Sequence, residues 1–381
     1  MKKVVHYVLL ASILLGIPFL SCYIGGYDEL LEGIKAFPPR TEDWGNRSDL
    51  LWNCRCPFHW GFFIGFSAFT LLCLYPFLRR CILSFCRSRK RDSRQKKVSY
   101  PFPWWGWIGM SIMVSGWYLS WNRFEWFGPY QVMFSYMPIW TGFIVLMNAL
   151  CVKRSGHSPM TDYPAAYLLT FPASSLFWWF FEYLNRYVWN WYYVGISELS
   201  AFEYSVYATI CFASVLPAVT AVAAWLHTFP AFHDSVYSGM ARVDLRRPFW
   251  CAFLFVLSMV GLTGIVFFPA YSYPLLWISP LAVFLLVQFV LREKSVLDTL
   301  AEGNWSVFFR FGLASLICGF CWETWNYYAL AKWIYAVPYV HRFEIWEMPL
   351  IGFAGYLPFG VECAAVTAWI SPFLVAPKKN G

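Results

Sequence analysis

The stretch that decides the fold occurs twice, as FEYSVYATICFASVLP at 202–217 and as FEIWEMPLIGFAGYLP at 343–358. An ungapped alignment of 162–225 with 303–366, an offset of 141 residues, gives 14 identities in 64 positions. The identical residues include Glu, Asn and Pro, which rarely coincide by chance in apolar segments. The sequence therefore predicts an internal duplication, and a duplication sets the architecture.

The composition is that of a membrane protein. Hydrophobic residues make up 59% of the 381 residues and charged residues only 13%, whereas a soluble domain carries about 25% charged residues. Several stretches of about 17 to 25 residues with few charges are long enough to cross the roughly 30 Å hydrocarbon core as helices. We therefore predict an all-α, polytopic membrane protein. The 23 Trp, 24 Tyr and 37 Phe exceed what interfacial anchoring needs and favour an aromatic-lined cavity.

About ten transmembrane helices are expected, two N-terminal helices followed by a tandem parallel 4+4 repeat. They are predicted near 4–22, 59–78, 105–121, 133–151, 165–187, 205–227, 249–268, 274–291, 306–328 and 348–372. The corresponding regions are an N-terminal part, 1–78, with an external segment, 23–58; a basic cytoplasmic linker, 79–103; repeat one, 104–245; and repeat two, 246–376.

The distribution of Lys and Arg predicts the orientation. If 79–97 is cytoplasmic, the other loops that carry Lys or Arg next to a helix end also fall on the cytoplasmic side. Both termini are then cytoplasmic, 188–203 and 329–346 are external, and the chain is expected in a bacterial inner (cytoplasmic) membrane. Because each repeat crosses the membrane four times, the two copies have the same orientation and are related by an axis along the membrane normal.

The net charge of +8 does not indicate a nucleic-acid partner, because nine of the 29 Lys and Arg residues lie in 79–97. Such a cluster is typical of a cytoplasmic loop that obeys the positive-inside rule. Anionic lipid headgroups at 79–97 are the alternative interpretation. The expected partners are therefore the lipid bilayer and a hydrophobic small molecule, with no nucleic acid.

Two features near the N-terminus leave alternatives open. The first apolar helix ends at Ser21-Cys22, so it is either an uncleaved membrane helix or a signal sequence, although Phe19 and Leu20 fit a cleavage site poorly. Cys54 and Cys56 are predicted to be external and close to Cys22, so the formation of a disulfide is left as an alternative if the outer compartment is oxidising. The sequence offers no complete set of metal ligands and identifies no cofactor.

The candidate functional residues begin with the duplicated Glu-x-x-Asn motif. Glu182 with Asn185, and Glu323 with Asn326, each lie on one face of a predicted helix near its outer end. A carboxylate at that depth must be protonated, paired or next to a polar cavity. One interpretation is acid/base chemistry or ligand binding over an aromatic pocket. The other is that each motif braces its own aromatic loop by bonding to backbone amides.

Further acidic residues follow the motif. Each aromatic loop ends in a second Glu, Glu203 or Glu344, and the symmetry of the repeats could bring these residues together with Glu182 and Glu323.

Repeat two adds His341, Glu347 and Glu362, and Glu362 aligns with Ala221 of repeat one. A lone Glu inside a membrane helix is a functional-site candidate, or it pairs with a polar residue such as Arg310 or His227.

One segment, about 320–362, resembles the membrane lycopene cyclase family. The resemblance lies in Trp322-Glu323-Thr324-Trp325-Asn326, in Trp333-Ile334-Tyr335, and in Gly355-Tyr356-Leu357-Pro358 followed by Glu362. The family is built from tandem copies of a small helical domain and cyclises the ends of an isoprenoid through protonation and carbocations. The resemblance implies an intramembrane enzyme, although the family's two adjacent acids after the Pro are absent here.

These observations yield a set of candidate residues and three classes of function. The predicted catalytic residues are Glu323, Asn326, Glu362, Glu182 and Asn185, and the predicted substrate-binding residues are Glu203, Glu344, Glu347, His341, Trp322, Trp333 and Tyr335. The first class is an intramembrane enzyme that acts on an isoprenoid or lipid by carboxylate acid/base chemistry. The second is a transporter or channel, and the third is a non-catalytic membrane scaffold or assembly factor.

Overall fold

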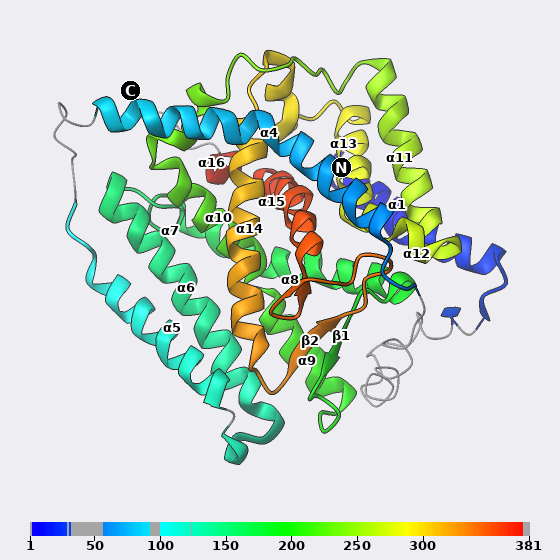
Figure 1. Ribbon diagram of the computed structural model, residues 1–381, viewed down its shortest axis with the longest axis horizontal. Coiled ribbons are helices and arrows are strands. Elements are labelled where there is room, and N and C mark those ends of the chain that lie inside the picture. The colour runs from blue at the N-terminus through cyan, green and yellow to red at the C-terminus, as the bar shows by residue number, and fades with distance from the viewer. Residues whose placement is uncertain (1, 29, 32–55, 92–99, 123, 376–381) are drawn as a thin grey trace.

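The computed structural model describes residues 2–28, 30–31, 56–91, 100–122 and 124–375. Helices account for most of this part of the chain, which confirms the all-α prediction (Figure 1). Cys54, for which a disulfide was left open, lies outside the described residues, while Cys22 and Cys56 carry free thiols.

The helices follow the predicted order. In the first half they are α1 (Lys2–Ile24), α4 (Trp60–Arg91), α5 (Trp104–Asn122), α6 (Gln131–Ser155), α7 (Pro159–Asp162), α8 (Pro164–Val188), α9 (Ala201–Phe212) and α10 (Val215–His227). In the second half they are α11 (Pro248–Phe267), α12 (Pro269–Ser272), α13 (Ser279–Val290), α14 (Ser306–Tyr327), α15 (Tyr356–Ile370) and α16 (Pro372–Val375). The 3-10 helices are η1 (Glu125–Tyr130), η2 (Pro230–Phe232), η3 (Asp234–Val236), η4 (Tyr273–Trp277), η5 (Val296–Glu302) and η6 (Leu350–Gly355).

Several of these helices can span a membrane. By length and composition, six helical segments of the described chain qualify, or seven if a bent pair, 269–277 with 279–290, forms one span. The chain is therefore a multi-pass helical membrane protein. The local sequence supports these helices, since Pro164 and Pro248 occupy first-turn positions, where a missing N–H has no consequence.

Two predicted helices are interrupted. The predicted helix 205–227 is split between α9 and α10. The hydroxyl of Ser174, on α8, forms hydrogen bonds on both sides of the break: it donates to Phe212 O at 2.5 Å and accepts from Leu216 N at 3.1 Å. A backbone break inside a membrane protein needs such partners, because lipid supplies none. The predicted helix 274–291 is bent by 50° between η4 and α13.

The helices form a central group with two helices on one side and three on the other (Figure 1). At the centre α14 packs on α15 and α10, and α10 packs on α8. On one side α5 and α6 lie against each other, with glycines at the crossing; a Cβ on Gly142 would lie 2.4 Å from Met113 N. On the other side α11 packs on α13 and α1.

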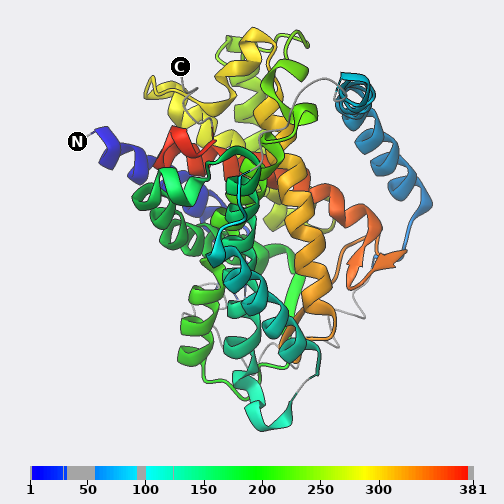
Figure 2. The ribbon, with the colours of Figure 1, turned by 90° about the vertical axis from the view of Figure 1, so that its left-hand side faces the viewer.

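Helix α4 lies apart from this body (Figure 2). Its predicted range, 59–78, is too short, because the helix continues to Arg91 and so includes the start of the basic stretch. Near its N-terminus the ring of Phe62 stacks on Tyr339 at 4.8 Å. Near its middle Phe77 stacks on Phe309 at 5.3 Å. Between these two anchors the helix is largely exposed.

Two short antiparallel ladders were not predicted. Strand β1 (Trp191–Val194) pairs with β2 (Lys332–Tyr335), and β3 (Glu344–Ile345) pairs with β4 (Met348–Pro349). The β1–β2 ladder joins the aromatic loop of the first half to that of the second. In this ladder Trp191 lies opposite Tyr335, and Tyr193 lies opposite Trp333.

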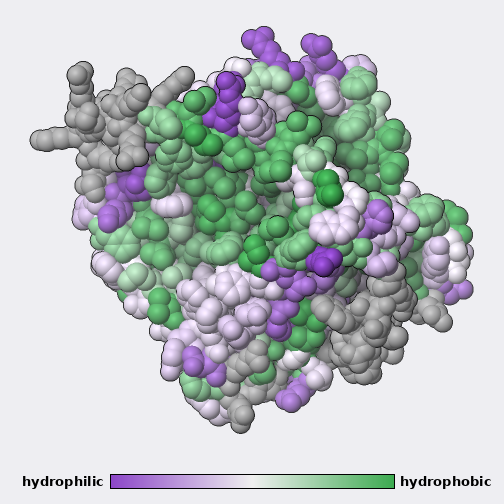
Figure 3. Space-filling view, viewed as in Figure 1, coloured by the Kyte–Doolittle hydropathy of each residue, from purple (hydrophilic) through white to green (hydrophobic). Residues whose placement is uncertain are grey.

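The surface agrees with a membrane environment. The face seen in Figure 3 is dominated by hydrophobic residues, with hydrophilic residues gathered along the upper rim and across the lower part. Leu72 of α4 is 74% exposed and Phe249 of α11 is 71% exposed. Large apolar side chains at this exposure are stable when they contact lipid.

Candidate functional site

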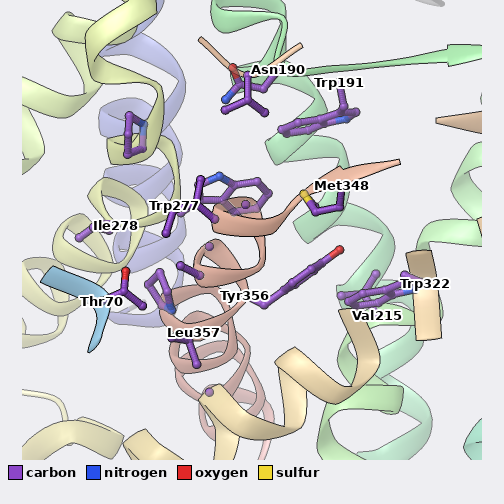
Figure 4. A pocket seen from close by; sticks show the side chains of 18 of the residues that line it. Thr70, Asn190, Trp191, Val215, Trp277, Ile278, Trp322, Met348, Tyr356 and Leu357 are labelled. Carbon is purple, nitrogen blue, oxygen red and sulfur yellow. The ribbon is translucent and has the colours of Figure 1, made fainter. Parts of the chain in front are cut away.

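A cavity of about 1080 Å³ lies between α4 and the body of the protein. Its walls come from α4, α9, α14, the β1–β2 ladder, η4, and the segment where η6 passes into α15. The volume is at the upper end of the range for ligand pockets. Figure 4 shows Trp191, Trp277, Trp322 and Tyr356 around this space, with Thr70 of α4 on the opposite side.

The wall of the cavity is mainly aromatic. Trp277 stacks on Trp191 at 5.6 Å, and Trp322 stacks on Tyr356 at 5.9 Å. Trp322 was predicted to bind substrate, and it does line the cavity. Rings in offset contact of this kind form a rigid apolar surface with a few polar edges.

The polar edges at one end of the cavity converge on two carboxylates. Oε1 of Glu182 accepts hydrogen bonds from Trp178 Nε1 at 3.0 Å, from Trp191 Nε1 at 2.9 Å and from Tyr193 OH at 2.7 Å. Glu182 is only 4% exposed. Three donors on a single oxygen hold this carboxylate in one orientation.

Glu323 has the matching arrangement. Its Oε1 accepts hydrogen bonds from Tyr335 OH at 2.7 Å, from Tyr356 OH at 2.8 Å and, at 3.4 Å, from Trp333 Nε1. Glu323 is fully buried, and its Oε2 has no hydrogen-bond partner in the described chain. Within the described residues, neither the Glu323 carboxylate nor any of its three donors forms an ion pair or a cation–π contact with a Lys or Arg.

The two asparagines have a structural role. Asn185 accepts from Trp191 N at 3.3 Å and donates to Trp191 O at 2.6 Å. Asn326 does the same for Trp333, at 2.9 Å and 2.7 Å. Each Asn therefore fixes the backbone of the Trp that bonds to the neighbouring Glu. The brace that was one interpretation of the motif exists, but the amides make it, while the carboxylates bond aromatic side chains.

The β1–β2 ladder brings the two sets of donors together. Alternate residues of a strand share a face, and so do residues directly opposite each other. Trp191, Tyr193, Trp333 and Tyr335 consequently lie on one face of the ladder. Burial and the adjacent carboxylates raise the pKa of Tyr193 and of Tyr335. Both hydroxyls therefore stay protonated and remain donors.

Neither Glu182 nor Glu323 forms part of the cavity wall. Their six donors do, namely Trp178, Trp191, Tyr193, Trp333, Tyr335 and Tyr356. The carboxylates thus stand behind the wall and orient it. Any proton that passes between Glu323 and the cavity has to pass through a tyrosine hydroxyl.

The other predicted acids lie elsewhere. Glu203 caps α9, where its Oε2 accepts from Ser200 N at 2.9 Å and from the Ser200 hydroxyl. Glu344 is exposed on β3 and lies 3.2 Å from His341 Nε2. Glu347 forms an ion pair with Lys332.

Each of these two acids, Glu203 and Glu344, therefore has a partner of its own. Burial lowers the pKa of His341, although Glu344 acts in the opposite direction.

Glu362 binds to a helix end. Its Oε1 accepts from Leu281 N at 3.0 Å, in the first turn of α13, directly after the bend. A carboxylate is favourable there because the first N–H groups of a helix are unpaired and carry positive partial charge. The suggested partner Arg310 instead donates to Asp234 Oδ1 at 3.0 Å and to Val375 O at 2.9 Å.

Sequence reasoning missed four donors. Trp178, Trp191, Tyr193 and Tyr356 were not among the predicted site residues. The signal available was the Trp-x-Tyr pattern, which follows Glu182 after nine residues and Glu323 after ten. That shift of one residue hides the correspondence from an ungapped alignment.

The described residues contain no group of three or more His, Cys, Asp or Glu that could hold a metal ion. No protein-family model matches the chain, and neither a curated protein nor a solved structure matches it.

Proposed function

We propose that this membrane protein takes an isoprenoid or other lipid chain from the bilayer into the cavity beneath α4. The observation that carries the proposal is that the six aromatic donors to Glu182 and Glu323 all line the cavity. The two buried carboxylates fix the orientation of the aromatic side chains in one wall of the cavity. A wall held in one orientation is what the recognition of a ligand requires.

Access from the bilayer is supported by the position of α4. Between its two anchors, the turn that lines the cavity also faces outward, with Phe69 64% exposed. An apolar chain can reach the cavity beside this helix without crossing a polar layer. A water-soluble substrate would have to pass through lipid to do so.

In this proposal Glu182 and Glu323 are positioning residues. The groups that meet the ligand are indole N–H and phenol O–H groups, which are weak acids. They recognise polar features of a ligand, and their ring faces stabilise positive charge.

A second candidate function is acid/base catalysis on the same ligand, in line with the resemblance to the lycopene cyclase family. The hydroxyls of Tyr335 and Tyr356 connect Glu323 to the cavity. In such a step a phenol proton adds to an alkene carbon, the alkene π electrons form the new C–H bond, and protonated Glu323 returns a proton to the phenol oxygen. The resulting carbocation is consumed by ring closure and loss of a proton.

We further propose that the chain is a parallel duplication. With the one-residue shift of the Trp-x-Tyr pattern, Tyr192 corresponds to Ile334, and the ladder pairs these two residues. A twofold axis through that pair relates Trp191 to Trp333 and Tyr193 to Tyr335. The matched bonding of Glu182 and Glu323 supports the same axis. We retain the ten-helix arrangement with both termini cytoplasmic as part of this proposal.

The binding proposal is tested by filling the cavity. Thr70 faces the cavity and Leu71, its neighbour, does not line it and is 64% exposed. We expect lipid extracted from the purified protein to be lost in Thr70→Trp and retained in Leu71→Trp, as measured by mass spectrometry of the organic extract. Equal retention in both variants would contradict the proposal.

Catalysis is tested separately. Lipid extracts of cells with and without the protein should differ in isoprenoid profile if the protein is an enzyme. An unchanged profile, together with solute flux in liposomes, would favour a transporter, and an unchanged profile without flux would favour a scaffold.

A further inference from the structure

The two ends of the cavity differ chemically. One end is closed by the β1–β2 ladder and lies beside Trp322, whereas the other end lies beside Trp305. Trp305 is the N-cap residue of α14 and Trp322 lies within this helix, 17 positions later, which corresponds to about 25 Å along the helix. The cavity is therefore long enough to hold an extended chain.

The end near Trp305 is basic. Arg79 and Arg80 both line the cavity there, in the turn of α4 that follows Phe77. Arg80 is already engaged, because its guanidinium donates to Val236 O at 2.9 Å and to Ser238 O at 2.7 Å. These bonds anchor α4 to the loop before α11.

Arg79 is not engaged in this way. Among the described residues it forms no ion pair and no hydrogen bond, although its side chain borders an otherwise apolar space. A guanidinium offers five donors and binds phosphate oxygens in pairs. Asp234, two residues before the Val236 that Arg80 bonds, forms its ion pair with Arg310.

We infer that the ligand is an anionic amphiphile, bound with its phosphate-like headgroup at Arg79 and its chain directed toward the aromatic wall. The inference rests on the proposed function and adds the headgroup and the direction of the chain. An unpaired cation at the mouth of an apolar cavity complements a lipid whose only charge is at one end. The aromatic donors at the far end then meet the end of the chain.

The test is equilibrium binding of tritiated geranylgeranyl phosphate to the full chain in nanodiscs of uncharged lipid. Uncharged geranylgeraniol is measured in parallel. The wild type should bind the phosphate more tightly than the alcohol. Arg79→Gln should weaken phosphate binding by about tenfold, the change expected for one charge-assisted hydrogen bond, and should bind the alcohol as the wild type does.

Unchanged alcohol binding also verifies that Arg79→Gln is folded. Arg247→Gln is the matched control, because Arg247 is 75% exposed and does not line the cavity; it should change neither affinity. Equal affinity of the wild type for phosphate and alcohol, or full phosphate affinity in Arg79→Gln, would overturn the inference.

Two further outcomes separate the possibilities. Binding of neither isoprenyl compound nor of lysophosphatidic acid would contradict the proposed function itself, whereas binding of both isoprenyl compounds without preference contradicts only the headgroup assignment. Lysophosphatidic acid, an acylglycerol phosphate, is the third probe. If it binds as tightly as the isoprenyl phosphate and depends equally on Arg79, the headgroup assignment stands and the chain is an acyl chain.

Discussion

The ring of Tyr356 occupies the space that a side chain at Gly319 would need. A Cβ on Gly319 would lie 2.4 Å from Cε2 of Tyr356. In the alignment at an offset of 141 residues, Tyr356 corresponds to Val215 and Gly319 corresponds to Trp178. In the first half the large residue, Trp178, lies on α8 and the smaller Val215 begins α10. In the second half the order is reversed, with the small Gly319 on α14 and the large Tyr356 at the start of α15. In both copies the large residue is the third donor to the Glu.

This exchange predicts a coupled pair of substitutions. Gly319→Trp alone overpacks the site and should cost about 1–3 kcal/mol, and Tyr356→Val alone should cost about 2–4 kcal/mol because it leaves a cavity. The double variant recreates the arrangement around Glu182, so its loss should be smaller than the sum by about 1–3 kcal/mol. Thermal unfolding in detergent measures all four proteins, and additive losses would contradict the correspondence.

Two substitutions of Glu323 distinguish a carboxylate that only positions the aromatic wall from one that also transfers a proton. Glu323→Gln keeps an oxygen that can accept from the tyrosines, so the fold and lipid binding should persist. If the protein is an enzyme, the same variant should lose activity because the ionisable proton is gone. Glu323→Leu leaves three buried donors unpaired and should cost about 1–3 kcal/mol or more. A fully active Gln variant beside an unstable Leu variant would identify Glu323 as a positioning residue only.

Glu362 should stabilise the bent helix. Glu362→Ala introduces the residue found at the aligned position, Ala221, and leaves Leu281 N without its acceptor. The expected loss is about 1–3 kcal/mol, and it should appear as faster hydrogen exchange at the start of α13. Glu362→Gln keeps an acceptor and serves as the control. Equal exchange in the Ala variant and the wild type would remove this role.

The ion pair between Asp234 and Arg310 predicts a pH dependence. Burial opposes the charged form of Asp234, but Arg310 and the hydroxyl of Ser306 lower its pKa below the ordinary value. A lowered folded-state pKa contributes stability above the unfolded value of about 3.9, and this stability is lost as pH falls through the folded value. The thermal midpoint should therefore fall more steeply below about pH 4 in the wild type than in Asp234→Asn.

The topology can be tested by labelling. In a cysteine-free background, Gln95→Cys and Ser200→Cys should react with a membrane-impermeant reagent from opposite sides. The reason is that every Lys- and Arg-rich loop shares a side when 79–97 is cytoplasmic. Labelling of both positions from the same side would refute the predicted orientation.

Much of the helical layout was predictable, because apolar segments of membrane length are visible in the sequence. The Glu-x-x-Asn motif was also found, since polar residues in register stand out in an apolar chain. The break at Ala213 was missed because the hydrogen bonds that compensate for it come from Ser174, 39 residues earlier along the chain. Such a contact exists only after folding.

The aromatic partners of the carboxylates were missed for a related reason. The ladder pairs Trp191 with Tyr335, residues 144 positions apart, and no local pattern indicates that two loops will form strands together. The position of α4 was equally hidden. Its composition predicts a membrane helix but does not distinguish one packed in the body from one that stands beside a cavity.

The β1–β2 ladder makes each half of the chain dependent on the other. Strand β1 belongs to the first half and β2 to the second, so either half alone would present a row of unsatisfied N–H and C=O groups. On the duplication that we propose, two separate copies of one half could meet this need only by associating across the same twofold axis. Joining the halves in one chain makes that association intramolecular, so the ladder forms without a second molecule.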